Sequence, residues 1–294
     1  MTKTRTKKSA SGRTPVRRRP RKRFGQHFLA PAWAAKVVEA IQPVRGDAFL
    51  EIGPGAGAIT LPLAATGLPI LAVEIDRDLA AELASKAPPN VTILVDDVLK
   101  ADVMPYLSGL SPQGPPDASG LALPARRLRV VGNLPYYVTS PILFWLVGLH
   151  RTHRLIHDAT LMVQREVADR LAARPGTKDY GVLAVTTAVH ARVSRLLELP
   201  PGAFTPAPKV RSTLVRLELT EPSVRIPDEA LFERLVKTIF SQRRKTLANA
   251  LKAFDRTAPL VLSAMKLDGR RRPETLHIEE IARIAELIAA AHRN

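Results

Sequence analysis

The tetrapeptide Asn133-Leu134-Pro135-Tyr136 carries groups suited to chemistry on an aromatic amine. Such an amine is a poor nucleophile because its lone pair is delocalised into the ring. The amide oxygen of Asn133 and a backbone carbonyl near Leu134 could accept hydrogen bonds from its two N–H groups. These bonds would direct the nitrogen lone pair at an electrophilic methyl group. Tyr136 offers a ring on which a nucleobase can stack. We expect Asn133 to work by positioning and electrostatics, since an amide does not titrate near neutral pH. The alternative is a proline turn with a buried tyrosine.

A glycine-rich segment, E-I-G-P-G-A-G at residues 51–57, is typical of a loop that binds a nucleotide. Glycines such as Gly53 let a ligand approach bare backbone beside the start of a helix. Glu74 follows in a second apolar run and could accept hydrogen bonds from a ribose diol. Asp97 could bind an adenine amino group, or it could cap the next helical turn. The spacing G-x-G-x-G favours a methyltransferase over a nicotinamide dehydrogenase, which stays a weaker alternative.

The surrounding pattern predicts the elements that position these residues. Short apolar runs alternate with segments of helical periodicity, which indicates βαβ units and a parallel, doubly wound sheet. The predicted strands are 48–52, 69–75, 91–95, 128–131 and 159–163. The predicted helices are 33–41, 59–65, 78–86, 141–149, 181–190 and one that begins at residue 166. Residues 104–127 interrupt this alternation with several prolines, so we interpret them as an inserted loop.

The last third of the chain changes in character. Apolar segments at 192–199 and 210–219 predict an antiparallel strand pair that closes one end of the sheet. Beyond residue 221 the periodicity is helical, at 227–240, 245–254, 258–265 and 278–290. We therefore expect an α/β domain over residues 24–220 and a small helical domain over residues 221–294.

The charge of the chain is strongly positive. It has 44 Lys and Arg against 27 Asp and Glu, a formal charge of +17 and a pI near 10.7. Residues 1–23 hold eleven of the basic residues and no acid, so we expect a disordered basic tail there. The remaining charge of about +6 still indicates a polyanionic partner.

Two absences from the sequence limit the alternatives further. There is no cysteine, which excludes disulfides and thiolate metal sites, so we expect no metal and a reducing compartment, the cytoplasm. No apolar run reaches the length of about 18 residues needed to span a bilayer, so no membrane association is expected.

Several motifs together resemble the ribosomal RNA adenine N6-dimethyltransferase family. These are E-I-G-P-G-x-G, V-E-I-D, which ends the second strand, and N-L-P-Y-Y-V-T-S-P. G-Q-H-F-L at 25–29, A-F-T-P-A-P-K-V at 203–210 and F-S-Q-R-R-K-T-L at 240–247 are similar to further motifs of that family. The matches run from about residue 21 to residue 255, and their order and spacing make chance agreement implausible.

The resemblance implies a Rossmann-like methyltransferase domain, a helical domain that contacts RNA, and S-adenosylmethionine as the cofactor. It implies that the target adenine lies between Tyr136 and Phe204, whose loop is fixed by prolines. The cofactor contacts it implies are His27, Leu29, Gly53, Glu74, Asp97 and Asn133. RNA phosphates would contact the basic run Arg243, Arg244 and Lys245, for which a solvated basic face is the alternative.

Within the family, N-L-P-Y and R-R-K-T-L resemble the branch that methylates two adjacent adenosines in the 3′-terminal hairpin of small-subunit (16S) ribosomal RNA. The expected partner is then an assembling ribosomal subunit, and the enzyme is expected to be a monomer. One alternative is a large-subunit methyltransferase of the macrolide-resistance type, and another is a ribosome-assembly factor without turnover. The sequence departs from the family at His27, where Asn is usual, and at Arg211, where an acid is usual.

Overall fold

The computed structural model describes residues 27–108 and 127–293. The predicted basic tail at 1–23 and most of the predicted inserted loop lie outside the described residues. No helix in these two ranges is long and apolar enough to cross a membrane.

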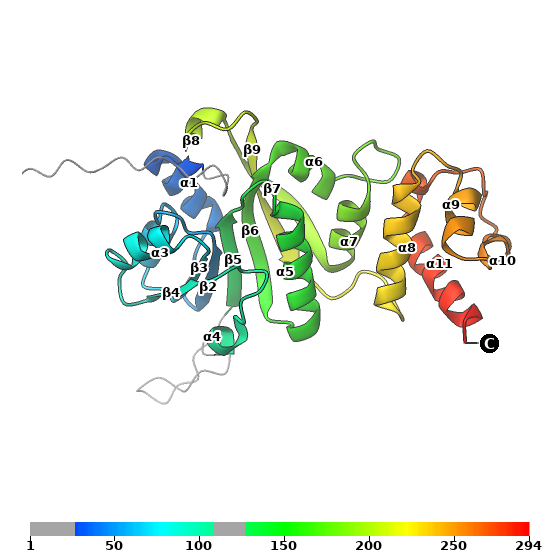
Figure 1. Ribbon diagram of the computed structural model, residues 1–294, viewed down its shortest axis with the longest axis horizontal. Helices are drawn as coiled ribbons and strands as arrows, with labels where there is room; N and C mark the ends of the chain where they lie inside the picture. The colour runs from blue at the N-terminus through cyan, green and yellow to red at the C-terminus, as the bar shows by residue number, and fades with distance from the viewer. Residues whose placement is uncertain (1–26, 109–126, 294) are drawn as a thin grey trace, which may run out of the picture.

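A seven-stranded sheet forms the centre of the larger part of the molecule (Figure 1). Its strand order is β4-β3-β2-β5-β6-β9-β7. The strands are β2 (Asp47–Ile52), β3 (Ile70–Glu74), β4 (Val91–Val95), β5 (Arg127–Asn133), β6 (Ile156–Gln164), β7 (Ala191–Leu199) and β9 (Ser212–Leu219). The first five pair in parallel, whereas β9 is antiparallel to both β6 and β7. Both the predicted doubly wound sheet and the antiparallel pair that closes it are confirmed.

Alternate residues along the strands supply two separate cores, one on each face of the sheet. Phe49 and Ile70 pack with the buried residues of α1 (Pro31–Ile41) and α2 (Thr60–Ala64). Their neighbours Leu50 and Leu71 belong to the opposite core, which contains residues of α5 (Thr139–His153) and α6 (Arg165–Leu171). A strand buried on both faces reads as a continuous apolar run, which explains why the sequence predicted these strands so directly.

A short two-stranded pairing was not predicted. β1 (Phe28–Leu29) pairs antiparallel with β8 (Phe204–Thr205), so that Leu29 lies opposite Phe204. β8 follows a 3₁₀ turn, η2 (Pro201–Ala203). This pairing joins segments far apart in sequence, and it determines where Phe204 lies.

The predicted inserted loop begins with a helix. Residues Met104–Ser108 form α4, so the loop interpretation is wrong for this part of the 104–127 segment. Val103 and Leu107, one helical turn apart, are both buried in the core that α5 shares. Local burial of this pair outweighs the prolines that suggested a loop.

The remaining helices gather at one end of the molecule, away from the sheet (Figure 1). They are α8 (Glu229–Ser241), α9 (Leu247–Phe254), α10 (Ala258–Ala264) and α11 (Ile278–Ala291), with the 3₁₀ turn η3 (Pro273–Thr275). The Asp228 side chain accepts a hydrogen bond from the Leu231 amide and so fixes the start of α8. The core of these helices also contains buried residues of α7 (Val182–His190). The predicted helices are confirmed, and α7 connects them to the sheet.

A buried arginine ties the sheet to α1. Arg129 on β5 is 4% exposed and pairs with Asp47 at 3.0 Å and with Asp158 at 2.8 Å. It also donates to the carbonyl of Ile41 at the end of α1. Three strands and one helix end therefore depend on a single guanidinium group.

Candidate active site

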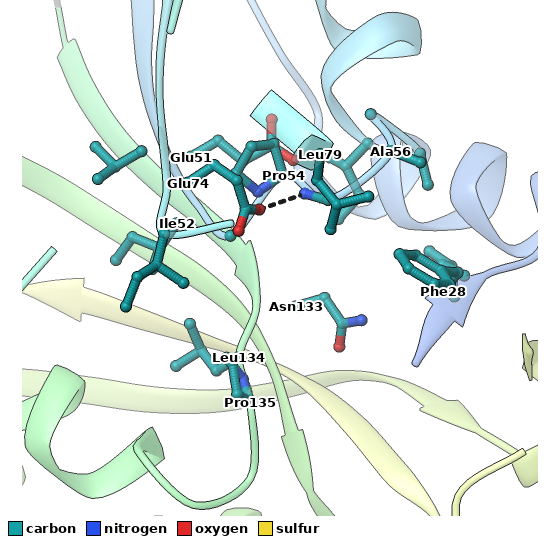
Figure 2. Close-up of a pocket in the computed structure, with 18 of the residues that line it drawn as sticks. Phe28, Glu51, Ile52, Pro54, Ala56, Glu74, Leu79, Asn133, Leu134 and Pro135 are labelled. Carbon is teal, nitrogen blue, oxygen red and sulfur yellow. Dashed lines mark hydrogen bonds between the residues drawn. The ribbon is translucent and has the colours of Figure 1, made fainter. Parts of the chain in front are cut away.

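A cavity of about 660 Å³ opens at the carboxyl ends of the central strands. Here β2 has β3 on one side and β5 on the other, so the strand order reverses, the usual position for a ligand in an open α/β sheet. The predicted site residues that line this cavity are His27, Leu29, Gly53, Glu74, Asp97, Asn133 and Tyr136. Figure 2 shows part of this lining, with Glu74 and Asn133 facing the same space.

The glycine turn after β2 presents bare backbone to the cavity. Gly53 has a φ of +67°, a conformation that favours glycine, and a Cβ at this position would meet nothing within 4 Å. Gly57 has a φ of +88°, and a Cβ there would lie 2.6 Å from Leu83 Cδ1. One glycine therefore leaves room on the ligand side, and the other allows the turn to pack closely against α3 (Arg77–Ala84).

Glu74, at the end of β3, is held by backbone amides. One carboxylate oxygen accepts from the Gly55 amide at 2.9 Å, drawn as a dashed line in Figure 2, and the other accepts from the Asp76 amide at 2.9 Å. Burial raises the pKa of Glu74 above its usual value, although these hydrogen bonds act in the opposite direction. Each oxygen keeps a further lone pair with which it can accept from a ribose hydroxyl.

Glu51 is a feature that the sequence prediction left without a role. It is 1% exposed and lines the cavity, and its Oε2 atom has no hydrogen-bond partner among the described residues. Burial raises the pKa of Glu51 to about 7. Hydrogen bonds with Thr60 act against this rise and the nearby Glu74 adds to it, and a cationic ligand would favour the ionised form of Glu51. The available signal in the sequence was the acid directly before the glycine turn.

These residues fit the S-adenosylmethionine expected from the sequence. That molecule joins a nucleoside to a methionine chain through a positively charged sulfur. The open backbone at Gly53 and the anchored carboxylate of Glu74 suit its ribose, while the unpaired oxygen of Glu51 suits its positive charge.

Asp97 both caps the following turn and lines the cavity, the two roles that its position in the sequence allowed. Its Oδ1 atom accepts from the Leu99 amide at 3.1 Å, which caps the following turn. The same residue lines the cavity after β4. The cap therefore fixes the carboxylate without consuming all of its lone pairs.

Asn133 ends β5 with its side chain in the cavity. Its Nδ2 atom donates to the backbone carbonyl of His27 at 2.9 Å. This bond fixes which way the amide points and leaves Oδ1 as an acceptor. In Figure 2 the amide lies in the space between Phe28 and Leu134.

Tyr136 lies half-buried beside Asn133. Its hydroxyl is hydrogen-bonded to Ser212 Oγ at 3.0 Å, and burial raises its pKa. The ring facing it is that of His27, stacked at a centroid distance of 5.5 Å and an interplanar angle of 26°. His27 Nδ1 donates to the Pro206 carbonyl at 2.7 Å.

Phe204 is not brought into the cavity. It is 4% exposed, lies in the core that contains Leu29, and is not among the lining residues. A base between two rings requires them to be about 7 Å apart, twice the contact distance of about 3.5 Å between carbon atoms. At 5.5 Å, the Tyr136 and His27 rings leave no such space. A base therefore does not fit between Tyr136 and His27, and the stacking role of Phe204, which lies in the core opposite Leu29, stays a prediction.

The three residues of the predicted RNA-contacting run have different environments. Arg243 donates to the carbonyl of Lys178 at 2.6 Å and to that of Thr177 at 3.2 Å, so it joins the turn after α8 to the segment before α7. Arg244 and Lys245 are exposed. None of the three lines the cavity.

Comparison with known proteins agrees with this site. The model of the ribosomal RNA adenine dimethylase family matches residues 17–290. The protein named ribosomal RNA small subunit methyltransferase A of Nitrosococcus oceani is 44% identical over 265 residues, which cover 89% of this chain and 93% of that protein. The protein of the same name from Koribacter versatilis is 42% identical, with 89% and 92% covered.

Two solved structures share the fold over nearly the whole chain. A dimethyladenosine transferase from Plasmodium falciparum is 22% identical with a TM-score of 0.66, over 91% of this chain and 98% of that one. The 23S rRNA methyltransferase ErmE is 25% identical with a TM-score of 0.58, over 88% and 98%. With its family model matched almost from end to end and relatives above 40% identity, this chain belongs to the ribosomal RNA adenine dimethylase family.

Proposed function

We propose that this protein transfers methyl groups from S-adenosylmethionine to N6 of two adjacent adenosines in the 3′-terminal hairpin of small-subunit ribosomal RNA. The observation that carries the proposal is that Asn133 and Tyr136 line the same cavity as Glu74. An acceptor for an amino group and a stacking ring thus adjoin a nucleoside-type pocket. The small-subunit name of the relatives supports the choice of ribosomal RNA.

On the cofactor side, four residues divide the work. Glu74 and Asp97 both line the cavity, and we propose that Glu74 accepts from the ribose hydroxyls and Asp97 from the adenine amino group. Gly53 leaves the backbone accessible, and the unpaired oxygen of Glu51 favours a positively charged ligand. S-adenosylmethionine is the methyl donor, and when bound it supplies a methyl group on a sulfonium centre. His27 and Leu29, which also line the cavity, are proposed to complete the contacts.

On the substrate side, Asn133 and Tyr136 act on the base. Asn133 Oδ1, freed by the bond from Nδ2 to the His27 carbonyl, is the proposed acceptor for an N6 proton. Accepting that bond keeps the lone pair on nitrogen from delocalising into the ring and directs it at the methyl carbon. Tyr136 stacks on the base, and a hydrogen bond between its hydroxyl and Ser212 Oγ fixes the position of its ring. Phe204, which is not among the residues that line the cavity, is proposed as the second ring that contacts the base.

The RNA outside the pocket is proposed to contact the basic surface. Arg244 and Lys245 are available for phosphates, whereas Arg243 is used to join two segments of the protein. The target base must be flipped out of its hairpin, at a cost of a few kcal/mol that these contacts offset. We propose that the enzyme acts as a monomer, in the cytoplasm, on an assembling small subunit.

The test is methylation of two substrates in parallel, followed by mass spectrometry of the RNA nucleosides and mapping of the modified positions. Unmethylated small subunits should gain dimethyladenosine at two adjacent positions, and naked large-subunit RNA should gain none. Modification of the large-subunit RNA instead would support the resistance-type alternative. Binding of small subunits without any modification would support an assembly factor that lacks turnover.

A further inference from the structure

The rim of the cavity carries an aromatic ring that the proposed reaction does not use. Tyr137 lines the cavity next to Tyr136, yet it is 60% exposed. The two consecutive rings have different environments: Tyr136 is half-buried and bonded to Ser212, whereas no hydrogen bond of the Tyr137 hydroxyl is seen within residues 27–108 and 127–293. Among the described residues, Tyr106 is the other exposed tyrosine, and it does not line the cavity.

A cationic side chain lies beside the residue that anchors Tyr136. Arg211 is exposed and directly precedes Ser212, whose Oγ is hydrogen-bonded to Tyr136. The Arg211 carbonyl accepts from the Arg165 amide at 3.0 Å, which fixes its backbone at the start of β9. Arg165 is within 3.9 Å of Asp169, but no carboxylate of the described residues lies within 4.0 Å of the Arg211 guanidinium. Its five N–H donors are therefore available to an anion.

We propose that Tyr137 and Arg211 form a second nucleotide subsite, which binds the residue of the RNA strand next to the flipped adenosine. Tyr137 stacks on the neighbouring base, and Arg211 binds a phosphate of the same backbone segment. The inference rests on the proposed function, because a flipped base brings its flanking nucleotides to the rim of the pocket. A subsite of this kind suits a substrate in which both adenosines of an adjacent pair must be held in turn.

The stacking half of the proposal is tested with Tyr137→Ala, using unmethylated small subunits as substrate. We expect the KM for subunits to rise about tenfold, the size expected for one lost base stack. The kcat and the Kd for S-adenosylmethionine should stay within about twofold, since the rate-determining groups are untouched. Tyr137→Phe should restore the KM, and Tyr106→Ala, the exposed tyrosine away from the cavity, should leave it unchanged.

The phosphate half is tested by the salt dependence of subunit binding. Arg211→Ala should reduce the slope of log K against log salt by about 0.7 to 1, the value for one phosphate contact. Arg192→Ala is the control for position, because Arg192 is an exposed arginine at the far end of the same strand pair, where Ala191 pairs with Leu219; unlike Arg211, it lies 3.4 Å from a carboxylate, that of Glu218. It should leave the slope unchanged.

Failure of the proposed subsite and failure of the proposed methyl transfer give different results. A Tyr137→Ala variant with the wild-type KM, or a Tyr137→Phe variant as impaired as Tyr137→Ala, would overturn the stacking role. An unchanged salt slope in Arg211→Ala would overturn the phosphate contact. Failure of the proposed function would appear differently, as absence of dimethyladenosine with the wild-type protein. Because both side chains are exposed, thermal unfolding of the variants should match that of the wild type.

Discussion

The contributions of single side chains to cofactor binding and to methyl transfer can be measured separately. Glu51 provides a test of cofactor binding. Its pKa of about 7 means that much of the free protein carries a protonated Glu51 at neutral pH. A positively charged ligand favours the ionised form, so binding releases a proton. The affinity for S-adenosylmethionine should therefore rise as the pH increases toward 7 and level off above it.

Isothermal titration calorimetry between pH 5.5 and 8.5 measures this dependence directly. Glu51→Gln removes the titrating group but keeps the size of the side chain, and it should give an affinity that changes much less with pH. If the wild type and this variant show the same pH dependence, Glu51 does not face the positive charge of the cofactor.

Tyr136 allows stacking to be separated from hydrogen bonding. Tyr136→Ala should lower methyl transfer by about 10- to 100-fold, since a stacked base contributes about 1–3 kcal/mol. Tyr136→Phe keeps the ring and loses the bond to Ser212, so it should retain most of the activity. Steady-state kinetics with a separate measurement of cofactor affinity distinguishes the two. Equal losses in both variants would show that the hydroxyl matters and the ring does not.

At the level of strands and helices, Arg129 is the group on which most contacts depend. Arg129→Ala would leave Asp158 without its buried partner and remove the bond to the end of α1. We expect a loss of about 3–5 kcal/mol in the free energy of unfolding, the usual cost of breaking a buried ion pair.

The neighbouring Arg127 is a matched control. It also pairs with Asp47, at 2.9 Å, but its side chain is 44% exposed. Arg127→Ala should therefore cost no more than about 1 kcal/mol. Urea denaturation of the two variants and the wild type makes the comparison, and equal destabilisation by both substitutions would contradict the importance given to burial.

The elements also indicate which features a sequence can predict. β2, β3, β5 and β6 are buried on both faces, so the sequence showed them as apolar runs followed by turns, and with them Gly53, Glu74 and Asn133. The edge strand β4 is only partly buried, yet its apolar run, which precedes Asp97, was also predicted. The burial of Phe204 could not be predicted, because it follows from pairing with Leu29, a residue remote in the chain.

Other features escaped prediction for the same reason. The structural use of Arg243 depends on carbonyls at Thr177 and Lys178, and the role of Arg129 depends on acids on two neighbouring strands. A charge in a sequence looks the same whether it faces solvent or a distant partner. The contact of His27 with Tyr136 likewise joins segments separated by more than a hundred residues.

Across the whole molecule, two buried histidines lie where the sheet meets the helical end. His150 on α5 is 6% exposed and His190 on α7 is 5% exposed, and burial lowers the pKa of both. Among the titratable neighbours, Glu229 raises the pKa of His190, whereas Arg151, His150 and Arg154 lower it. Both histidines are thus held neutral at the junction of the two parts.

This arrangement predicts that acid destabilises the fold. The unfolded chain takes up protons on these residues near the ordinary histidine pKa of about 6.5, before the folded protein does. Their contribution to stability is present above that pH and is lost as the pH falls through it. Glu51 has the opposite sign, because its raised pKa makes stability fall as the pH rises from about 4.5 to 7.

A difference between two proteins isolates the histidine contribution. Urea denaturation of the wild type and His190→Gln at pH 7.5 and 5.5 should show a smaller acid-induced loss of stability in the variant. The Glu51 contribution is common to both and cancels. Identical losses in the two proteins would show that His190 titrates alike in the folded and unfolded states.

Across the whole molecule, the proposed reaction depends on Asn133 holding the amino group of the target adenine. The direct measurement is the single-turnover rate of methyl transfer, with cofactor and small subunits both saturating, for the wild type and Asn133→Ala. We predict a rate at least about 100-fold lower in the variant, the usual cost of losing a positioned electrostatic partner. Because the cofactor is saturating, loss of a cofactor contact at Asn133 does not by itself lower this rate. A variant that transfers the methyl group at the wild-type rate would contradict the account.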